Sequence, residues 1–466
     1  MIRPGNRPRS RAARRAFALV ASVTVLTPLM VISSSLSDPA HASSVTVGSC
    51  QLTVSFGGSA LTDTGSPPQI GAPSDNPTHV AVSEESGDCI LQFIETGTYD
   101  VQIPSNLSSL HALIVGGGGG GAFSGGGAGR FRDTFGSTPY TVGDGNDANE
   151  LLDLEVTVGA GGTGGKVASK NEEALRGANG GDSELTYETS GGEVTVTAEG
   201  GGGGAARGFG PSGDILGAGG SGVGSGGGTA TFANSGGGRS TSGASGTTIS
   251  GEQYPGGQTQ LSGGCETSNS YVVAVSGGGG GAGGPGTKGF LDGCFVNSGS
   301  GNGGSGAEST IVAADFAVGG ETSRSKVYYA GGGAGGSQPG SGTGPTRSGG
   351  LGGGGDTTSL GPTASSRDTN TGGGGGGVHL LFSHWQSDTE SSQSGSPGDS
   401  GIVILRYLVP SVAIDQSDSD VAFGDSLSLS ATKAGGGTLA WSADDAACTF
   451  NDASSETPTV TPGLDA

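Results

Sequence analysis

The stretch His111-Ala-Leu-Ile-Val115 runs directly into six glycines at residues 116–121, and this junction decides the fold. The same pattern, a short strand-forming run that ends in glycine, recurs along the chain. Its other copies are residues 154–158 before Gly159, 193–199 before Gly200, 271–275 before Gly277 and 326–330 before Gly331. The first four glycine starts are 43, 41 and 77 positions apart, the last being close to twice the others. This spacing predicts a repeated structural unit, which a flexible linker would not maintain.

The clearest strand is Leu152-Asp-Leu-Glu-Val-Thr-Val158, in which apolar and polar residues alternate strictly. Successive side chains of a strand point to opposite faces, so this pattern predicts a half-buried β-strand. We therefore expect an all-β fold.

Glycine dominates the composition, with 103 glycines among 466 residues, whereas only 32% of residues are hydrophobic. A side-chain core must therefore be thin. Ordering six consecutive glycines costs roughly 3 to 6 kcal/mol relative to alanine. Hydrogen bonds at about 1 kcal/mol each offset this cost if both backbone groups of each residue are paired. Extended left-handed helices with three residues per turn can pair in this way when every residue is glycine. We expect bundled polyglycine-type extended helices.

Several stretches resemble a known family. Phe93-Ile-Glu-Thr-Gly-Thr-Tyr-Asp-Val-Gln-Ile-Pro104, and Leu110 to Val115 with its glycine run, resemble the opening of bacterial and phage glycine-rich domains. They are also similar to the glycine-rich domain of the anaplastic lymphoma and leukocyte receptor tyrosine kinases. Gly177-Ala-Asn-Gly-Gly-Asp-Ser183 and Gly401-Ile-Val-Ile-Leu-Arg-Tyr407 resemble the family's middle and end. The resemblance covers residues 89–408 and implies a glycine-rich β-sandwich used for surface display, adhesion or ligand capture.

The two ends of the chain differ from this middle. Arginines crowd the first 15 residues, an apolar stretch follows, and Ala40-His-Ala42 is a small-x-small cleavage pattern. These features predict a signal peptide. The twin-arginine pathway is one possible export route for it. An uncleaved N-terminal membrane anchor is the alternative to a signal peptide. The strands expected at residues 411–415, 426–430 and 438–442 resemble the start of a bacterial immunoglobulin-like repeat with Trp441 in its core. We predict a signal peptide at residues 1–42, an N-terminal β segment at 43–88 tied by Cys50 to a glycine-rich domain at 89–408, and an incomplete immunoglobulin-like repeat at 409–466.

The formal charge is −22, and it becomes −27 when residues 1–42 are removed. Such an acidic chain does not suit nucleic acid as a partner. No later segment reaches the roughly 18 apolar residues of a membrane span. We expect a secreted or cell-surface protein without a membrane span in its mature chain.

Five cysteines fit an exported protein in which disulfides form. We pair Cys50 with Cys89 and Cys265 with Cys294, each within or beside predicted strands. Each loop would remove roughly 3 kcal/mol of unfolded-state entropy. Cys448 is left over, and if the chain is a fragment of a longer protein its partner lies beyond residue 466.

Several short motifs mimic enzyme or cofactor sites. Gly398-Asp-Ser-Gly401 copies the surroundings of a serine-protease nucleophile, but neither His79 nor His111 lies in that family's histidine context. A hydrolase that uses Ser400 remains a remote alternative to a turn before a closing strand. The glycines at 159, 161 and 164 match a dinucleotide fingerprint without the α/β alternation that it requires. Acidic groups at 144–147 and at Asp182 are incomplete as calcium sites. We expect no enzyme activity, no cofactor and no bound metal.

The densest aromatic stretch is His379-Leu-Leu-Phe-Ser-His-Trp385, which directly follows a glycine run and Val378. Core packing and an exposed contact surface are both open for it and for Tyr328 and Tyr329. If the stretch is exposed, its contact residues are His379, Phe382, His384 and Trp385. The sequence thus predicts a structural or adhesive protein that presents recognition loops on a glycine-rich scaffold to an unidentified protein or glycan. A flexible spacer of a surface layer is the alternative.

Overall fold

The computed structural model describes sixteen ranges up to residue 408 and shorter ones beyond. They are residues 21–23, 43–47, 50–56, 59–60, 79–104, 107, 109–142, 151–167, 174–206, 224–233, 254–262, 273–292, 299–338, 347–359, 370–379, 393–408, 411–414, 427–428, 430–434, 441–443, 448–452, 454–455, 457 and 459–462. All regular elements in these ranges are strands, which confirms the all-β prediction. No helix that is long and apolar enough to cross a membrane occurs among them.

The chain divides into two compact units, Ser34–Leu408 and a second unit of Met1–Ser33 with Val409–Ala466. Within the described residues of the second unit, the strand pairings are short and antiparallel. They join β1 (Ala21–Val23) to β29 (Trp441–Ala443), β26 (Ser411–Ile414) to β28 (Ala431–Ala434), and β31 (Thr459–Pro462) to both β27 (Leu427–Ser428) and β30 (Cys448–Phe450). The immunoglobulin-like arrangement stays a prediction. Apart from β1, residues 1–42 lie outside the described residues.

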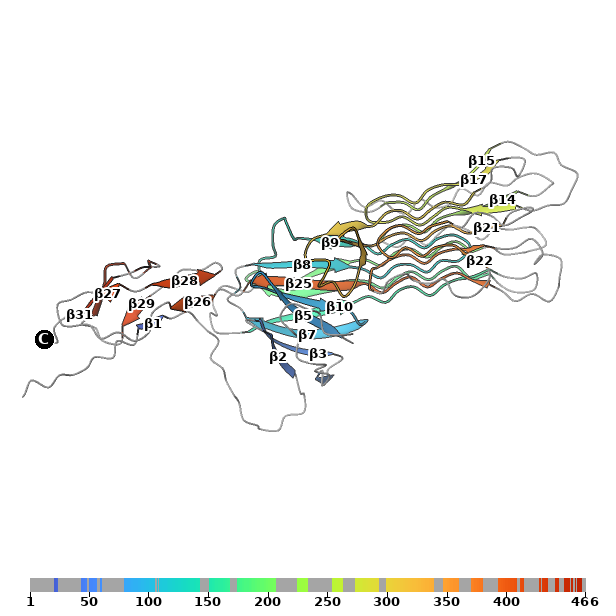
Figure 1. Ribbon diagram of the computed structural model, residues 1–466. Coiled ribbons are helices and arrows are strands. Elements are labelled where there is room, and N and C mark those ends of the chain that lie inside the picture. The colour runs from blue at the N-terminus through green and yellow to red at the C-terminus, as the bar shows by residue number, and fades with distance from the viewer. Residues whose placement is uncertain are drawn as a thin grey trace, which may run out of the picture. The chain divides into compact units, whose positions relative to one another are not determined.

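The larger unit contains a seven-stranded antiparallel sheet (Figure 1). Its order is β13-β12-β10-β7-β3-β2, with β4 beside β3. The strands are β2 (Ser43–Val47), β3 (Cys50–Phe56), β4 (Ser59–Ala60), β7 (Gly97–Pro104), β10 (Leu151–Val158), β12 (Ser183–Thr189) and β13 (Gly192–Ala198). In β10, Leu152 and Leu154 are buried while Asp153 and Glu155 are exposed, so the predicted alternation is confirmed.

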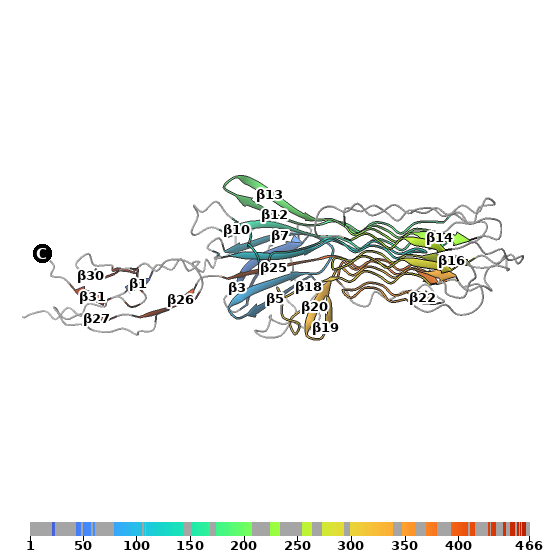
Figure 2. The ribbon, with the colours of Figure 1, turned by 90° about the horizontal axis from the view of Figure 1, so that it is seen from above.

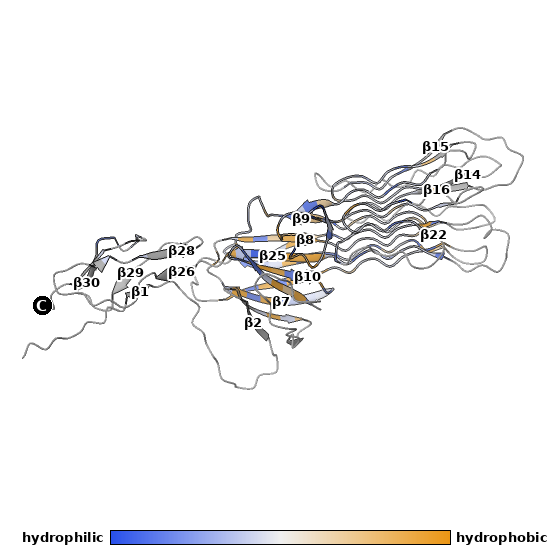
Figure 3. Ribbon diagram, in the orientation of Figure 1, coloured by the Kyte–Doolittle hydropathy of each residue, from blue (hydrophilic) through white to orange (hydrophobic). Residues whose placement is uncertain are grey.

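A second sheet has the order β5-β6-β25-β8-β9. Its strands are β5 (Val80–Glu85), β6 (Asp88–Phe93), β8 (Leu110–Val115), β9 (Phe131–Asp133) and β25 (Ile402–Leu408). β25 comes from the far end of the unit but lies in the centre, between β6 and β8. Both faces of β25 and most of β8 are buried, so these two strands lack the alternation seen in β10. Figure 3 shows the apolar residues gathered in these central strands.

The five-stranded sheet is covered on both faces. On one face Cys89 of β6 forms a disulfide with Cys50 of β3, and Phe93 packs edge-on against Tyr99 of β7 at 5.1 Å between ring centroids. The opposite face carries Ile404 and packs on a cluster that contains Ile311 and other buried residues of 311–330. This double coverage explains why β25 is buried on both sides and why its residues, except Arg406, are mostly apolar.

Residues 307–329 form a small layer of their own with the strand order β18-β20-β19. The strands are β18 (Ala307–Ser309), β19 (Glu321–Ser323) and β20 (Lys326–Tyr329). The buried amide of Gln92 holds the loop between them, since Nε2 donates to Phe316 O at 2.8 Å and Oε1 accepts from Val318 N at 3.0 Å. A polar side chain in the core is thus fully used in fixing this layer.

The remaining strands of this unit are short and lie at the ends of glycine runs that are remote from the two large sheets (Figures 1 and 2). They pair as β11 with β24, β14 with β16 and β16 with β21, β15 with β17, and β22 with β23. Their bounds are β11 (Lys166–Val167), β14 (Ala230–Ala233), β15 (Thr259–Ser262), β16 (Val273–Ser276), β17 (Gly289–Asp292), β21 (Ser337–Gln338), β22 (Thr358–Ser359), β23 (Val378–His379) and β24 (Gln393–Ser394).

The central position of β25 makes a stability prediction. Leu405 is fully buried, so Leu405→Ala should lower the free energy of unfolding by about 2 to 5 kcal/mol. The control is Leu151→Ala, because Leu151 is 49% exposed and its truncation should change stability by less than about 0.5 kcal/mol. Urea unfolding followed by circular dichroism measures both. Similar effects of the two variants would contradict the central placement of β25.

Candidate functional site

The largest feature outside the sheets is a set of glycine-rich runs that lie side by side without helix or strand structure (Figures 1 and 2). We call this set the glycine layer. Its runs are residues 116–121, 125–129, 159–165, 177–181, 200–204, 224–228, 256–257, 277–281, 283–288, 301–306, 331–336, 349–355, 372–377 and 395–401. They come from nearly the whole length of the unit.

Hydrogen bonds connect the runs with a period of three residues. In run 116–121, Gly117 N donates to Gly181 O and Gly120 N donates to Ala178 O, both at 2.9 Å. One residue further along, the amides of Gly118 and Gly121, which are again three residues apart, donate to carbonyls of run 395–401. The carbonyls of this run accept from three further runs, 200–204, 159–165 and 372–377, and Gly119 N donates to run 125–129. Run 116–121 therefore bonds to six neighbours, and both backbone groups of residues 117–121 are paired.

Close approach of the backbones explains the need for glycine at the centre of the layer. A Cβ on Gly119 would collide with the backbone of Gly202, and similar collisions with backbone atoms occur along the whole run. Backbone atoms cannot swing aside as the end of a side chain can. Glycine is required here by space rather than by an unusual φ.

Runs at the surface of the layer follow a different pattern. In run 159–165, Ala160 and Thr163 are exposed, while glycines 159, 162 and 165 are buried. In run 301–306, Asn302 and Ser305 are the exposed positions, again three apart. A local Gly-Gly-X period is thus the signal of a surface run. This local signal differs from the spacing of about 41 to 43 residues between glycine starts on which the predicted repeat rests.

Two polar side chains complete the bonding of run 200–204. Asp182 Oδ1 accepts from Gly200 N at 2.8 Å, and Asn179 Oδ1 accepts from Gly203 N at 3.0 Å. Their spacing of three residues matches the period of the runs. Asp182, weighed above as a calcium ligand, therefore serves the backbone of the layer.

No group of three or more metal-ligating side chains that could hold an ion occurs within the described ranges. Residues 144–147 lie outside these ranges. Glycines 159, 161 and 164 of the dinucleotide-like motif all belong to the glycine layer, where added Cβ atoms would collide with backbone carbonyls.

The sheets and the layer meet at a partly buried ion pair. Arg130 Nη1 lies 3.0 and 2.9 Å from the two carboxylate oxygens of Glu199. The same two residues are also linked through Arg130 N and Glu199 O at 2.8 Å, and Arg130 O accepts from Gly116 N at 3.0 Å. Charged hydrogen bonds thus fix the point where β8 and β13 pass into glycine.

Ser400 lies in run 395–401, which leads into β25, and its carbonyl accepts from Gly372 N at 2.8 Å, so this position is part of the glycine layer rather than the predicted turn. Asn370 Nδ2 donates to Ser400 Oγ at 3.2 Å, and Thr371 Oγ1 donates to the buried carboxylate of Asp399 at 2.6 Å. Of the two histidines that were weighed as bases, His79 pairs with Glu95 and His111 Nδ1 lies 2.9 Å from Thr134 O. Among the described contacts, the partner of the Ser400 hydroxyl is an asparagine rather than a histidine.

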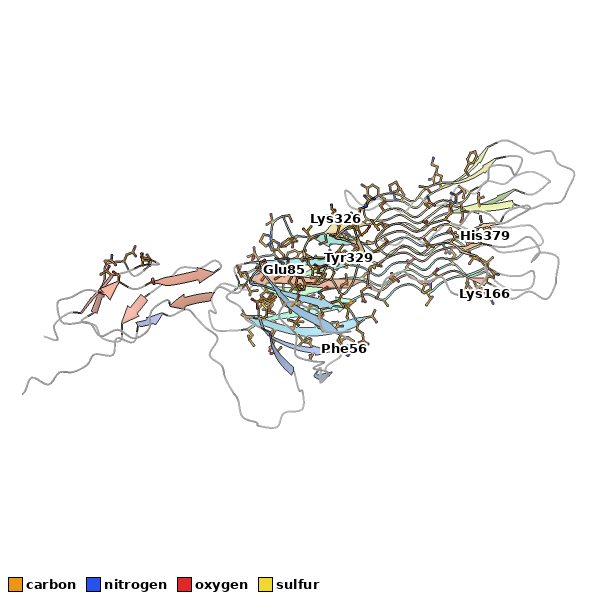
Figure 4. The ribbon with its side chains drawn as sticks, in the orientation of Figure 1. Phe56, Glu85, Lys166, Lys326, Tyr329 and His379 are labelled. Carbon is orange, nitrogen blue, oxygen red and sulfur yellow. A yellow bond between two sulfur atoms is a disulfide. The ribbon has the colours of Figure 1, made fainter. Side chains whose placement is uncertain are left out.

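The aromatic residues considered as a contact surface divide between two places (Figure 4). Tyr329 is fully buried in the core near the sheets, with its hydroxyl donating to Gly319 O at 3.3 Å, while Tyr328 is half-buried. His379 is 4% exposed at the other end of the glycine layer, where its Nδ1 lies 2.8 Å from Ser337 Oγ. Core packing therefore applies to Tyr329 and His379, and neither offers a contact surface. Phe382, His384 and Trp385 lie outside the described residues.

The structure contains the predicted disulfide between Cys50 and Cys89, and both cysteines are fully buried. It ties the N-terminal strand β3 to β6. Cys265 and Cys294 lie outside the described residues, so their pairing stays a prediction.

Residues 94–324 match a family model described as a glycine-rich domain. No curated protein matches the chain. The match confirms a glycine-rich domain as the middle of the chain. The similarity to receptor kinases and the immunoglobulin-like repeat stay predictions.

Close packing of the layer makes a prediction about single methyl groups. Gly119→Ala should lower the free energy of unfolding by about 3 kcal/mol or more, since the new Cβ has no space against the backbone of run 200–204. The matched control is Gly284→Ala in a surface run, where the nearest atom to a new Cβ is 3.9 Å away. That variant should change stability by less than about 1 kcal/mol. Equal tolerance of both, in denaturant unfolding, would argue against a packed layer.

Burial of His379 predicts a dependence on pH. Burial lowers the pKa of His379, so below about pH 6.5 the unfolded chain takes up a proton that the folded protein resists. The free energy of unfolding should therefore fall as the pH falls through this range. His379→Asn removes the titrating group and should make stability less dependent on pH. Urea unfolding at several pH values tests this, and an unchanged slope in the variant would contradict it.

Proposed function

We propose that this chain is an extracellular structural or adhesive protein, in which the glycine layer is a rigid platform and the segments that connect its runs carry recognition. The observation that carries the proposal is the pairing of both backbone groups along run 116–121 with six neighbouring runs. A segment that is hydrogen-bonded on all sides holds a fixed position. A rigid platform requires such fixed segments, whereas a flexible spacer does not.

We further propose that the runs are packed polyglycine-type extended helices. The three-residue hydrogen-bond period supports this form, because an extended left-handed helix has three residues per turn. Energies also allow it. Five glycines cost roughly 3 to 5 kcal/mol relative to alanine. Residues 117–121 take part in ten hydrogen bonds at about 1 kcal/mol each. Because each bond joins two runs, half of this energy, about 5 kcal/mol, is assigned to run 116–121, which offsets the cost of ordering its glycines.

The topology favours one end of the layer for recognition. β11, β14, β16, β21, β23 and β24 lie at the ends of runs that are remote from the large sheets (Figure 1). The chain leaves the described residues directly after β11, β14, β21 and β23. In the sequence these four strands are followed by residues 168–173, 234–253, 339–346 and 380–392, and the last of these segments contains Phe382, His384 and Trp385. We assign recognition to these connecting segments, since a backbone scaffold leaves binding to loops.

Two observations support a location outside the cell. The Cys50–Cys89 disulfide requires an oxidising compartment to form and persist. It also links β3 to β6, which supports a β-sandwich made by the two large sheets. The arginine-rich and then apolar N-terminus supports export. For the second unit, we propose an immunoglobulin-like segment that follows the glycine-rich domain.

Amide hydrogen exchange tests the platform directly. Residues 116–121, 200–204 and 277–281 should exchange about 1000-fold or more slowly than an unstructured chain, because their amides open only with the layer. The exposed hairpin turn at residues 190–192 is the internal control and should exchange fast. Fast exchange throughout the three runs would exclude the platform and favour the flexible spacer.

Cell fractionation tests the proposed extracellular location. A cytoplasmic location of the protein would contradict it.

A further inference from the structure

The strand β13 is an open edge of the seven-stranded sheet. Within the described residues it pairs with β12 alone, and Figure 2 shows the two strands as a hairpin at the margin of the sheets. Val194 and Val196 are half-buried on the core side, and Thr195 is exposed on the other face. An unpaired strand edge is a template for another strand unless charges, proline or a covering segment protect it. β13 contains no proline and a single charge, Glu193.

The backbone of β13 points outward at every second residue. Thr197 O accepts from Arg132 Nε of β9 at 2.7 Å, so the carbonyl of Thr197 points away from β12. Orientation alternates along an antiparallel strand, so Glu193 and Thr195 also direct their amides and carbonyls outward. Arg132 covers the edge at Thr197, and the hairpin turn at residues 190–191 ends the edge on the other side. The open edge therefore consists of the backbone groups of Glu193 and Thr195.

Charge is unbalanced along this edge. Glu193 lies directly opposite Glu188 in the pairing of β12 with β13, and like charges in such pairs are destabilising. Neither strand contains a lysine or an arginine. None of the ion pairs between described residues includes Arg132, which bonds a neutral carbonyl. Glu193 lies four residues from Thr197, about 13 Å along a strand, so it does not meet Arg132 of its own copy.

We propose that β13 pairs antiparallel with β13 of a second copy of this chain, an interaction that deepens the surface function proposed above and rests on it. One antiparallel register uses both open residues in both copies, and it places Glu193 opposite Thr195 of the second copy. Each such pair exchanges two hydrogen bonds, so the two pairs give about four. Val194 faces Val194 of the second copy at the two-fold axis, and each covers the half-buried side chain of the other.

The same register matches the unbalanced charges. Glu193 of one copy lies diagonal to Thr197 of the other, beside which Arg132 is held. Diagonal neighbours are about 7 to 8 Å apart, within reach of long side chains. The two-fold axis repeats the contact, so each acid gains a base, and the repulsion from Glu188 is offset. A second copy supplies this match, whereas an arbitrary extended peptide need not carry a base at that position.

Antiparallel pairing determines where the two glycine layers point. β13 leads through Glu199 into run 200–204, and Figure 2 shows the layer continuing in the direction of the strands. In the second copy β13 runs the opposite way, so its layer extends in the opposite direction. The dimer thus presents the connecting segments of its two layers on opposite sides, and it bridges two surfaces.

Sedimentation equilibrium of the full chain tests the dimer. A reversible equilibrium between monomer and dimer is expected, and it is weak because the interface is small. Thr195→Pro removes an amide that faces solvent in the monomer, so the variant should stay folded but associate about tenfold or more weakly. Thr195→Ala keeps the amide and should change the dissociation constant by less than about threefold.

Circular dichroism checks that both variants are folded. A chain that stays monomeric up to millimolar concentration, or a dimer that Thr195→Pro leaves intact, would overturn the proposal.

Cysteine cross-linking tests the register. In Val194→Cys the two new thiols face each other across the two-fold axis, with Cα atoms about 4.5 Å apart, which suits a disulfide. Val196→Cys is the matched control, because each new thiol faces Gly192 of the other copy. Mild oxidation should give a covalent dimer on non-reducing gels with the first variant and not with the second. Equal cross-linking of the two would contradict the register.

Charge reversal tests the match between Glu193 and Arg132. Glu193→Arg and Arg132→Glu should each weaken the dimer by about tenfold or more, because each brings like charges together. The double variant should restore the dissociation constant to within about threefold of the original. Glu155→Arg, at an exposed position on β10 away from the edge, is the control and should leave association unchanged. Effects that simply add in the double variant would count against the proposal.

The dimer and the platform are tested separately. Slow amide exchange in the glycine runs of a monomeric chain would overturn the dimer and leave the platform standing. Fast exchange would remove the platform and the bridging role with it, even where β13 still pairs. Negative-stain electron microscopy of the cross-linked Val194→Cys dimer should show the two glycine layers extending in opposite directions, and layers that lie side by side would overturn the antiparallel arrangement.

Discussion

The interaction on which the structure depends is the hydrogen bond between backbones that approach without side chains between them. In run 116–121 each amide and carbonyl of residues 117–121 meets a neighbouring run, and these neighbours come from positions as distant as 162 and 399. A methyl group at Gly119 would fall on the backbone of Gly202. Glycine is thus the residue that permits this order, because any larger one would separate the chains and leave their polar groups unpaired.

The two large sheets fix the register of the glycine runs, which the glycines alone do not define. Backbone bonds are identical from one glycine to the next, so a run could slip by three residues at little cost. β8 and β10 pass directly into a run, β13 does so after Glu199, and β25 directly follows a run. Ser183 Oγ donates to Val115 O and accepts from Gly159 N, which ties the starts of two runs to each other. With the Arg130–Glu199 pair, such side-chain contacts fix where each run begins.

Local patterns in the sequence were enough to predict the strands, since alternation in residues 152–158 and the strand-to-glycine junctions are local features. The Cys50–Cys89 bond was predictable because each cysteine adjoins a strand. The central place of β25 was not, because it depends on pairing with β6 and β8, which lie some 300 residues earlier. Tyr329 and His379 were ambiguous for a similar reason. Burial is set by residues that are distant in sequence, and nothing near either residue decides it.

The packing constraint also determines where this fold can acquire specificity. Positions such as Gly119 accept no side chain, so they cannot vary without loss of the layer. Variation is confined to the connecting segments and to the outward positions of surface runs, such as Ala160, Thr163, Asn302 and Ser305. These outward positions recur every three residues along a run whose backbone is held by its neighbours. Side chains placed there therefore form a regular row, whose composition can change without disturbing the bonds that order the layer.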